Sequence, residues 1–350
     1  MNAIVSFLSA NRDRLELDRF DLEGPVSSLF VTPRWPTSQH VVVLLMARGS
    51  GRPVLVAKLP RLQAGGEGLA REASTLVAVQ SARPEGFAGI PRVVAHERVG
   101  SRPLLVETAL RGRPVGSTIP RRGRPGYVAG ILDLLETLPR PTATLAGAYE
   151  RLIEEPLRRF ARSFGDGSEE ADLAERTLAL LDALRPMETP LVLEHGDLSH
   201  PNLISLEEGG IGVVDWELAE LNGLPAHDIC FFLAFVAFAT RRARTADERL
   251  AAFHDAFLAP GAWARSAISE YAQRLGVDAA LLTPLFIACW ARYTTRLAGR
   301  VGGDDETAAG VGESNAWPTH AGVASRLHAY PYFALWRHAM ALAPSLDWPD

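Results

Sequence analysis

The chain has 350 residues, of which 47% are hydrophobic and 22% charged, and this composition is typical of a globular protein long enough for two lobes with separate cores. Its formal net charge of −5 and isoelectric point near 6.0 exclude a general electrostatic attraction for nucleic acid or for an anionic membrane surface, so we expect neither as a partner. Any anionic ligand must therefore be bound by positively charged or hydrogen-bond-donating groups within its own site.

Targeting and redox signals are weak throughout the chain. The opening stretch MNAIVSFLSANRDRLELDRF lacks the basic start of a secretory signal, and the longest apolar run, 229–239, is too short for a bilayer and predicts a core helix. Cys230 and Cys289 lie in apolar surroundings, where buried thiols are expected. We therefore expect a cytoplasmic protein without disulfides.

Short apolar runs of strand length dominate residues 28–110. VVVLLMA at 41–47 and PVLVAKL at 53–59 flank the turn-like RGSGR, which predicts an antiparallel hairpin, and RPLLVET at 102–108 predicts a further strand. One helix is predicted between them at 67–82, from a stripe at spacings of three and four that comprises Leu69, Glu72, Leu76 and Val79. An acid on an apolar stripe requires a partner.

Lys58 is the only lysine, since arginine accounts for the other basic residues among the 36. A drift of the sequence toward arginine would replace lysine at every position where any long, positively charged side chain suffices. Arginine is planar and forked, whereas the lysine ammonium is compact. The survival of Lys58 therefore marks a position that arginine cannot fill.

The rest of the chain is predicted to be mainly helical. RGRPVGSTIPRRGRPG at 111–126 predicts a loop, and we favour a solvated surface over an anion-binding role for its arginines. Helices are then predicted at 126–138, 146–164 and 169–184, a strand in PLVLEH, and helices again after residue 225. Within that last part, 298–315 has the composition of a mobile loop.

The segment LEHGDLSHPNLISLEEGGIGVVDWE, starting at Leu193, carries the chemistry. NLISL and IGVVDW flank EEGG, which predicts a hairpin, and a turn centred between Glu208 and Gly209 sets Asn202 opposite Asp215. A carboxylate and an amide oxygen together suit Mg²⁺. Asp197, five residues before Asn202, can accept a proton from a hydroxyl nucleophile or orient it.

HGDLSHPN followed by VVDWE resembles the aminoglycoside phosphotransferase and choline kinase family of small-molecule kinases. The resemblance extends through VLVAKLP, REASTL, RPLLVETALRGRPV and GLPAHD, over roughly residues 40–240. It implies an α+β, protein-kinase-like bilobal fold, with a mainly β N-lobe containing one helix at 1–108 and a larger, mostly helical C-lobe at 109–350.

The resemblance also implies roles for individual residues. Asp197 would be the catalytic base, and Asn202 and Asp215 would bind Mg²⁺. Lys58 would hold the α- and β-phosphates of ATP or GTP while paired with Glu72.

The purine and the phosphates are expected to meet backbone groups. The segment from Glu107 to Ala109 resembles the hinge whose backbone receives the purine. The expected phosphate-covering loop, VTPRWPTSQHVVV at 31–43, contains no glycine, so the phosphates would meet Thr37, Ser38 and Arg34.

Several neighbouring residues have less specific expected roles. His195 is expected to brace the loop backbone, and Asp228 in PAHDI resembles a family position that hydrogen-bonds the catalytic loop. Glu217 would be a surface acid, or would reach the metal or a cationic acceptor, and Ser199 and His200 would face the acceptor.

Two functions from different classes remain. The leading hypothesis is an ATP- or GTP-dependent O-phosphotransferase acting on a hydroxylated small molecule such as an amino sugar, antibiotic, sugar or amino alcohol. The alternative is a pseudokinase that serves as a binding or scaffold protein, which the glycine-free loop favours. A protein kinase is disfavoured because HGD replaces HRD and no APE segment follows.

The acceptor is expected to bind between the catalytic loop and the helices of residues 229–350. Aromatic faces there, with acids such as Asp255 or Glu270, would suit a quaternary ammonium or an amino sugar. For any single ring, however, a place in the helical core is favoured. The rings in question are Trp263, Trp290, Trp317, Tyr330, Tyr332, Phe333 and Trp336.

Overall fold

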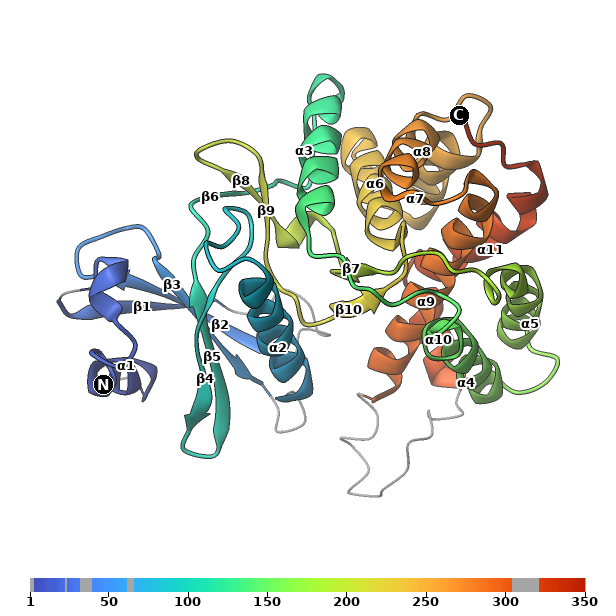
Figure 1. The fold of residues 1–350 in the computed structure, drawn as a ribbon. Coiled ribbons are helices and arrows are strands. Elements are labelled where there is room, and N and C mark those ends of the chain that lie inside the picture. Colours follow the sequence, from blue (N-terminus) through green and yellow to red (C-terminus); the bar gives the residue numbers. More distant parts are fainter. Residues whose placement is uncertain (1–2, 23, 32–39, 62–65, 304–320, 350) are drawn as a thin grey trace. The chain divides into compact units, whose positions relative to one another are not determined.

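The computed structural model describes residues 3–22, 24–31, 40–61, 66–303 and 321–349. The chain divides into two compact units, which are coloured along the sequence in Figure 1. Unit 1 comprises Met1–Val115 and Pro201–Ala219, and unit 2 comprises Gly116–His200 and Glu220–Asp350. By contacts, the hairpin segment therefore packs with the N-terminal sheet, whereas we assigned it to the C-lobe from sequence.

An antiparallel five-stranded sheet forms the centre of unit 1, in the order β1-β2-β3-β5-β4. The predicted hairpin is confirmed, with Val42 opposite Lys58 across β2 and β3. Alternate apolar residues of these strands pack with Ile4 and Leu8 of α1 (Ala3–Ala10) in a buried core. The strands are β1 (Val26–Val31), β2 (His40–Ala47), β3 (Leu55–Pro60), β4 (Val93–Val99) and β5 (Arg102–Thr108).

Helix α2 (Gly66–Ala82) lies against β3, β4 and β5, as Figure 1 shows, and confirms the predicted helix. Leu69 and Ala73 pack against Leu105 of the sheet. Glu72 lies on this same buried face, so its carboxylate is carried into the interior of unit 1.

A second, three-stranded sheet contains β6 (Gly112–Pro114), β8 (Leu203–Leu206) and β9 (Ile211–Val213). The predicted loop at 111–126 is thus partly a strand. The predicted hairpin is present, with positive φ at its two turn glycines, but its register is displaced by one residue. Leu203 faces Val213, which sets Asn202 opposite Val214 instead of Asp215.

Unit 2 is mostly helical, as predicted. The short strands β7 (Val192–Glu194) and β10 (Glu220–Gly223) pair within it, and only β7 was expected. The helices are α3 (Arg124–Thr137), α4 (Glu155–Phe164), α5 (Glu169–Leu181), α6 (His227–Arg241), α7 (Ala246–Phe253), α8 (Trp263–Leu275), α9 (Leu282–Gly303), α10 (Ala321–His328) and α11 (Tyr332–Leu342).

Helix boundaries in unit 2 follow local chemistry. Ser168 caps α5 by accepting a hydrogen bond from the Ala171 N–H, and three acids follow in the first turn. The apolar run 229–239 is buried in α6, and both cysteines are buried thiols, as expected. Helix α9 continues to Gly303, so the start of the loop predicted at 298–315 is helical, while its remainder lies outside the described residues.

Among the helices of the described ranges, none is both long enough and apolar enough to cross a membrane.

Candidate active site

Lys58 lies at the centre of a buried charge cluster in unit 1. Its ammonium nitrogen is 2.6 Å from Glu72 Oε1, 3.2 Å from Glu107 Oε1 and 3.5 Å from Asp215 Oδ1. The side chains of Lys58, Glu72 and Glu107 are at most 5% exposed, whereas Asp215 is 41% exposed. The expected ion pair between Lys58 and Glu72 is therefore present, and two further acids join it.

The register of β3 and β5 explains how Glu107 reaches the lysine. Lys58 faces Leu105 and Val56 faces Glu107, so Lys58 and Glu107 share one face of the sheet at a diagonal position. From the sequence, we expected a role only for the backbone of this segment. The pairing of two distant strands was the missing information.

The hinge expectation for the backbone of Glu107 and Ala109 stays a prediction, and the structure adds one constraint at Ala109. Its backbone N–H donates to the Val54 carbonyl at 2.9 Å and extends the pairing of β3 with β5. This amide is already used within the sheet, so it is not available as a purine donor in this structure. Glu107 likewise lies within β5, where its side chain carries the distinctive chemistry.

One ammonium cannot neutralise three carboxylates, and the pKa values reflect this. Burial opposes the charged form of Lys58, but Glu107, Glu72 and Asp215 outweigh it and raise the lysine pKa well above its usual range. Burial raises the pKa of Glu72 to about 8, and that of Glu107 also rises, although Lys58 opposes both shifts.

The same cluster contains unsatisfied acceptors. Glu72 Oε2 and Glu107 Oε2 are buried and have no hydrogen-bond partner among the described residues. Buried carboxylate oxygens without donors are costly. An excess of hard oxygen donors fits a divalent cation such as Mg²⁺.

The turn after β9 brings Asp215 to the lysine. Asp215 has a φ of 70°, so the chain leaves the strand direction there. The next residue fixes the turn, because the Trp216 N–H donates to Glu72 Oε1 at 2.9 Å and the buried indole N–H donates to Val213 O at 3.1 Å. Glu72 thus binds both the lysine and the DWE turn. The role of Trp216 in fixing this turn was not predicted from the sequence.

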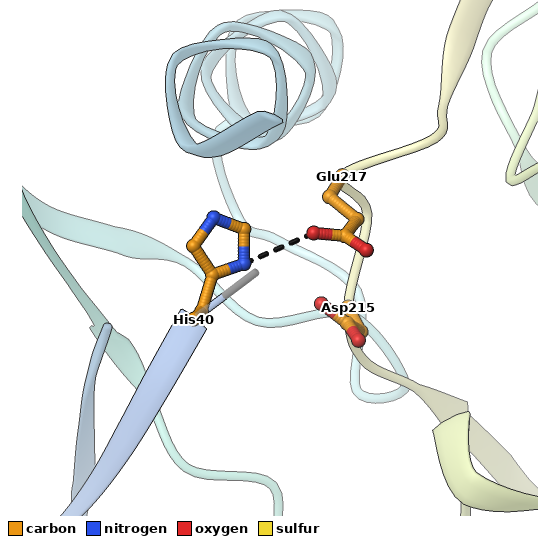
Figure 2. Close-up of side chains that lie close together, drawn as sticks. All are labelled: His40, Asp215 and Glu217. Atoms are coloured by element: carbon orange, nitrogen blue, oxygen red, sulfur yellow. Dashed lines mark ion pairs between the residues drawn. The ribbon is translucent and has the colours of Figure 1, made fainter. Parts of the chain in front are cut away.

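A second group of ligand-type side chains adjoins Asp215, and Figure 2 shows them facing one another. His40 Nδ1 is 3.0 Å from Glu217 Oε2, and one ligand atom each of His40, Asp215 and Glu217 lies within 4.8 Å of the others. Burial opposes the imidazolium, but Glu217 and the neighbouring acids outweigh it and raise the pKa of His40. His40 was not singled out in the sequence, where it is only the residue before an apolar run.

Two expected ligands remain predictions. Asn202 is buried, and its backbone carbonyl accepts a hydrogen bond from the Val214 N–H at 3.0 Å, which closes the hairpin beside the DWE turn. Its side-chain amide is the part expected to meet the metal. Ser38 and the segment 32–39, expected to cover the phosphates, lie outside the described residues.

The loop that carries Asp197 belongs to unit 2 and is held by buried groups. The Asp228 carboxylate accepts hydrogen bonds from the His195 N–H at 2.6 Å and the Gly196 N–H at 2.9 Å. The Asp197 N–H donates to His195 Nδ1 at 3.2 Å, and Ser199 Oγ donates to Asp197 at 3.3 Å. The bracing roles expected for Asp228 and His195 are confirmed, and the catalytic role of Asp197 stays a prediction.

A buried ion network supports this loop from the preceding strand. Glu194 of β7 accepts from Arg292 at 2.6 Å, from Arg296 at 3.0 Å and from the Leu224 N–H at 2.9 Å. Burial would raise its pKa, but the arginines and His227 outweigh burial and lower it. Gly223 permits the close pairing, because a Cβ there would lie 2.2 Å from Glu194 Cβ. Sequence reasoning missed this network because its members are far apart along the chain.

The aromatic residues of unit 2 mostly fill its core, as favoured from sequence. Trp290, Phe333 and Trp336 are buried, and Trp317 lies outside the described residues. The two acids proposed to meet a cationic acceptor are engaged elsewhere, since Asp255 pairs with Arg241 and Glu270 with Arg274. Burial, with Asp197 adding to it, raises the pKa of Tyr332 to about 12.

Comparison with known proteins gives one family and a set of solved structures. The model of the phosphotransferase enzyme family matches residues 41–268. No curated protein sequence matches the chain significantly.

The solved structures share the fold at low identity. A choline kinase of Streptococcus pneumoniae has 11% identity and a TM-score of 0.53 and covers 96% of this chain and 99% of its own. An ethanolamine kinase of Plasmodium vivax has 12% identity and a TM-score of 0.52, and the match covers 98% of this chain and 90% of that chain. An aminoglycoside phosphotransferase of Streptomyces rimosus has 18% identity and a TM-score of 0.50, and the match covers 84% of this chain and 99% of that chain. The fold is protein-kinase-like, as expected, and no support emerges for the pseudokinase alternative.

Proposed function

The chain belongs to the phosphotransferase enzyme family and is a small-molecule phosphotransferase, and from this premise we propose that it moves the γ-phosphate of ATP or GTP to a hydroxyl of its acceptor. The reaction forms a bond between the acceptor oxygen and the γ-phosphorus and breaks the bond from that phosphorus to the bridging oxygen. The hydroxyl proton leaves with Asp197 or with solvent, and the nucleoside diphosphate departs.

The observation that carries the proposal is the buried Lys58–Glu72 pair, with Asp215 3.5 Å from the same ammonium. Three residues from a strand, a helix and a hairpin end meet at the point where a nucleotide would require a cation and a metal ligand. Burial of so many charges costs several kcal/mol per ion unless they are paired, so a cluster kept for stability alone is a poor explanation.

Each residue in this proposal has a distinct role. Lys58 neutralises charge on the α- and β-phosphates, and Glu72 keeps its ammonium in place. Asn202 and Asp215 would hold Mg²⁺, which when bound supplies positive charge to the transferring phosphate. Asp197 orients the acceptor hydroxyl for in-line attack, on a loop held by Asp228.

The acceptor class is proposed from the names of the solved relatives. Choline kinase and ethanolamine kinase are named for amino alcohols, and aminoglycoside phosphotransferase for amino sugars. A hydroxyl on a nitrogen-bearing molecule is common to all three. We therefore place amino alcohols, amino sugars and antibiotics of that type first, and simple sugars after them.

The test couples a substrate screen to one substitution. Nucleotide consumption is measured with ATP and GTP against alcohols, amino sugars, nucleosides and antibiotics. Asp197→Ala should abolish turnover of any substrate found while nucleotide binding is retained, and the exposed Asp166→Asn serves as control. Turnover by Asp197→Ala at the parent rate would remove Asp197 from the mechanism.

A further inference from the structure

His40 is a buried ligand-type side chain of unit 1 that the proposed mechanism does not use. It is the first residue of β2 and faces Glu217 and Asp215 across a short gap, as Figure 2 shows. One ligand atom from each of these three residues lies within 4.8 Å of the other two. An imidazole and two carboxylates at such separations form a donor set that a single cation can draw together.

Rigid elements hold these donors. His40 is 7% exposed and stands opposite Pro60 in the β2–β3 register, so the sheet fixes its position. Gly68, in the first turn of α2, lies beside the group, since a Cβ there would be 3.5 Å, an ordinary contact distance, from both Glu217 Oε2 and His40 Cε1. Binding sites on strands and turns fixed in this way keep their geometry better than sites on loose loops.

The surroundings also favour an added cation. Lys58 is already shared by Glu72, Glu107 and Asp215, and Glu217 adds a further acid next to Asp215. Glu72 Oε2 and Glu107 Oε2 lack hydrogen-bond partners in the described part of unit 1. Acid groups outnumber cationic groups here, and a divalent ion at Asp215 would offset the difference.

We propose that His40 provides a nitrogen ligand which, with Asp215 and Glu217, gives the metal site of this phosphotransferase a preference for Mn²⁺ over Mg²⁺. The inference rests on the proposed function for the presence of a metal at Asp215. Mg²⁺ takes oxygen ligands and keeps several waters. Imidazole is a ligand of first-row transition ions, and Mn²⁺ is the first member of the series that orders their affinities for such ligands. Mn²⁺ also accepts carboxylates, so it suits a mixed set of one imidazole and two carboxylates.

A simpler role would make His40 only an ion-pair partner of Glu217, at 3.0 Å. The two roles predict different spectra. A ligand nitrogen couples directly to the electron spin of bound Mn²⁺, whereas a histidine held by Glu217 alone remains outside the coordination sphere. The distinction does not depend on any catalytic rate.

The experiment uses the full chain with Mn²⁺ and without nucleotide or acceptor. Pulsed electron paramagnetic resonance should detect nitrogen coupling on bound Mn²⁺, and protein labelled with ¹⁵N-histidine should show the coupling of that isotope instead. In His40→Gln, which keeps a hydrogen-bonding group toward Glu217, the histidine coupling should disappear. The preference for Mn²⁺ over Mg²⁺ should fall by about 10-fold, the lower end of what loss of a supporting group at a metal site costs.

Two comparisons make the result decisive. His96→Gln, at an exposed position of β4, should leave both the coupling and the preference unchanged. Glu217→Gln should weaken Mn²⁺ binding while the histidine coupling of the remaining complex persists. The isotope experiment on the parent chain needs no variant, so a parent chain whose bound Mn²⁺ shows no histidine coupling would reject the proposal even if His40→Gln fails to fold.

Bound Mn²⁺ without histidine coupling in the parent chain, or coupling that survives in His40→Gln, would overturn the proposal. Either result would leave the proposed phosphoryl transfer intact, because no turnover is measured. Conversely, a chain that binds Mn²⁺ through His40 but transfers no phosphate would keep this inference and reject the proposed function.

Discussion

Lys58 contacts acids from three elements: α2, β5 and the turn after β9. The ammonium has three N–H groups on one compact nitrogen, and the three nearest carboxylate oxygens lie at 2.6, 3.2 and 3.5 Å. A guanidinium spreads its donors over a planar fork that reaches further from the strand. This geometry accounts for one lysine in a chain that otherwise uses arginine.

Replacement of this lysine by arginine is therefore not conservative. We expect Lys58→Arg to lower kcat/KM by about 100-fold, the scale that a displacement of about 1 Å costs when reacting groups must be aligned. The measurement is steady-state phosphate transfer with the best substrate from the screen. Arg52→Lys, on the surface of unit 1, controls for a general effect of exchanging these residues. Activity of Lys58→Arg equal to that of the parent would show that any cation suffices.

The residues that sequence reasoning missed share one physical reason. Glu107, named from the sequence only for its backbone, reaches Lys58 with its side chain through the pairing of β3 with β5. His40 meets Glu217, which lies far along the chain. The one-dimensional pattern contains neither contact. Lys58 and Glu72, by contrast, stood out through composition and helical spacing, and they form the expected pair. A residue with an unusual type or an awkward position is visible in the sequence, whereas an ordinary residue with a particular neighbour is not.

Among the elements, the hairpin shows how close the sequence came. Its two strands and its turn glycines were predicted, but the register was wrong by one residue. Leu203 and Ile204 on one strand, and Val213 and Val214 on the other, are adjacent apolar pairs, so alternation could not choose between the two registers. Asp215 nonetheless reaches Lys58, because its positive φ turns the chain out of the strand.

The Asp228 carboxyl, which holds the loop after β7, should make the stability of the chain depend on pH. Burial, reinforced by Glu194, raises the pKa of Asp228 from 3.8 to about 6, although the His195 and Gly196 amides favour its ionised form. A carboxyl with a raised folded-state pKa binds its proton more tightly in the folded chain. Its contribution to stability is therefore fully present below pH 3.8 and is lost as the pH rises toward 6.

The variant Asp228→Asn cannot ionise and should not show that loss. Its free energy of unfolding minus that of the parent should increase between pH 3.8 and 6, by at most about 3 kcal/mol from the shift in pKa. Urea unfolding at several pH values measures the difference, with Asp166→Asn as the exposed control. A difference that stays constant over this range would mean that Asp228 ionises as readily in the folded chain as in the unfolded one.

For the whole molecule, the fold class expected from the sequence agrees with the structure, whereas the expected lobe boundary and the compact units divide the chain differently. The protein-kinase-like fold followed from motif order, and the family model confirms the family over residues 41–268. The compact units, however, divide the chain at Val115 and return Pro201–Ala219 to the first unit. The chain thus enters unit 1 twice, and a division that follows the sequence alone cannot represent this.

Ligand binding should be visible as stability of the whole chain. A nucleotide that binds only the folded state adds about 2.7 kcal/mol at one hundred times its Kd, which corresponds to a rise in Tm of about 4 °C for a chain of this size. We expect this rise with ATP or GTP in the presence of Mg²⁺ and a much smaller one in Lys58→Arg, because the cluster around Lys58 holds the proposed phosphate-binding cation. Differential scanning fluorimetry with each nucleotide, with the metal alone and with nucleotide plus chelator separates the two contributions. If neither nucleotide raises Tm in the parent chain at millimolar concentration, the proposed co-substrate is wrong, whereas an equal rise in Lys58→Arg would place the phosphates away from this lysine.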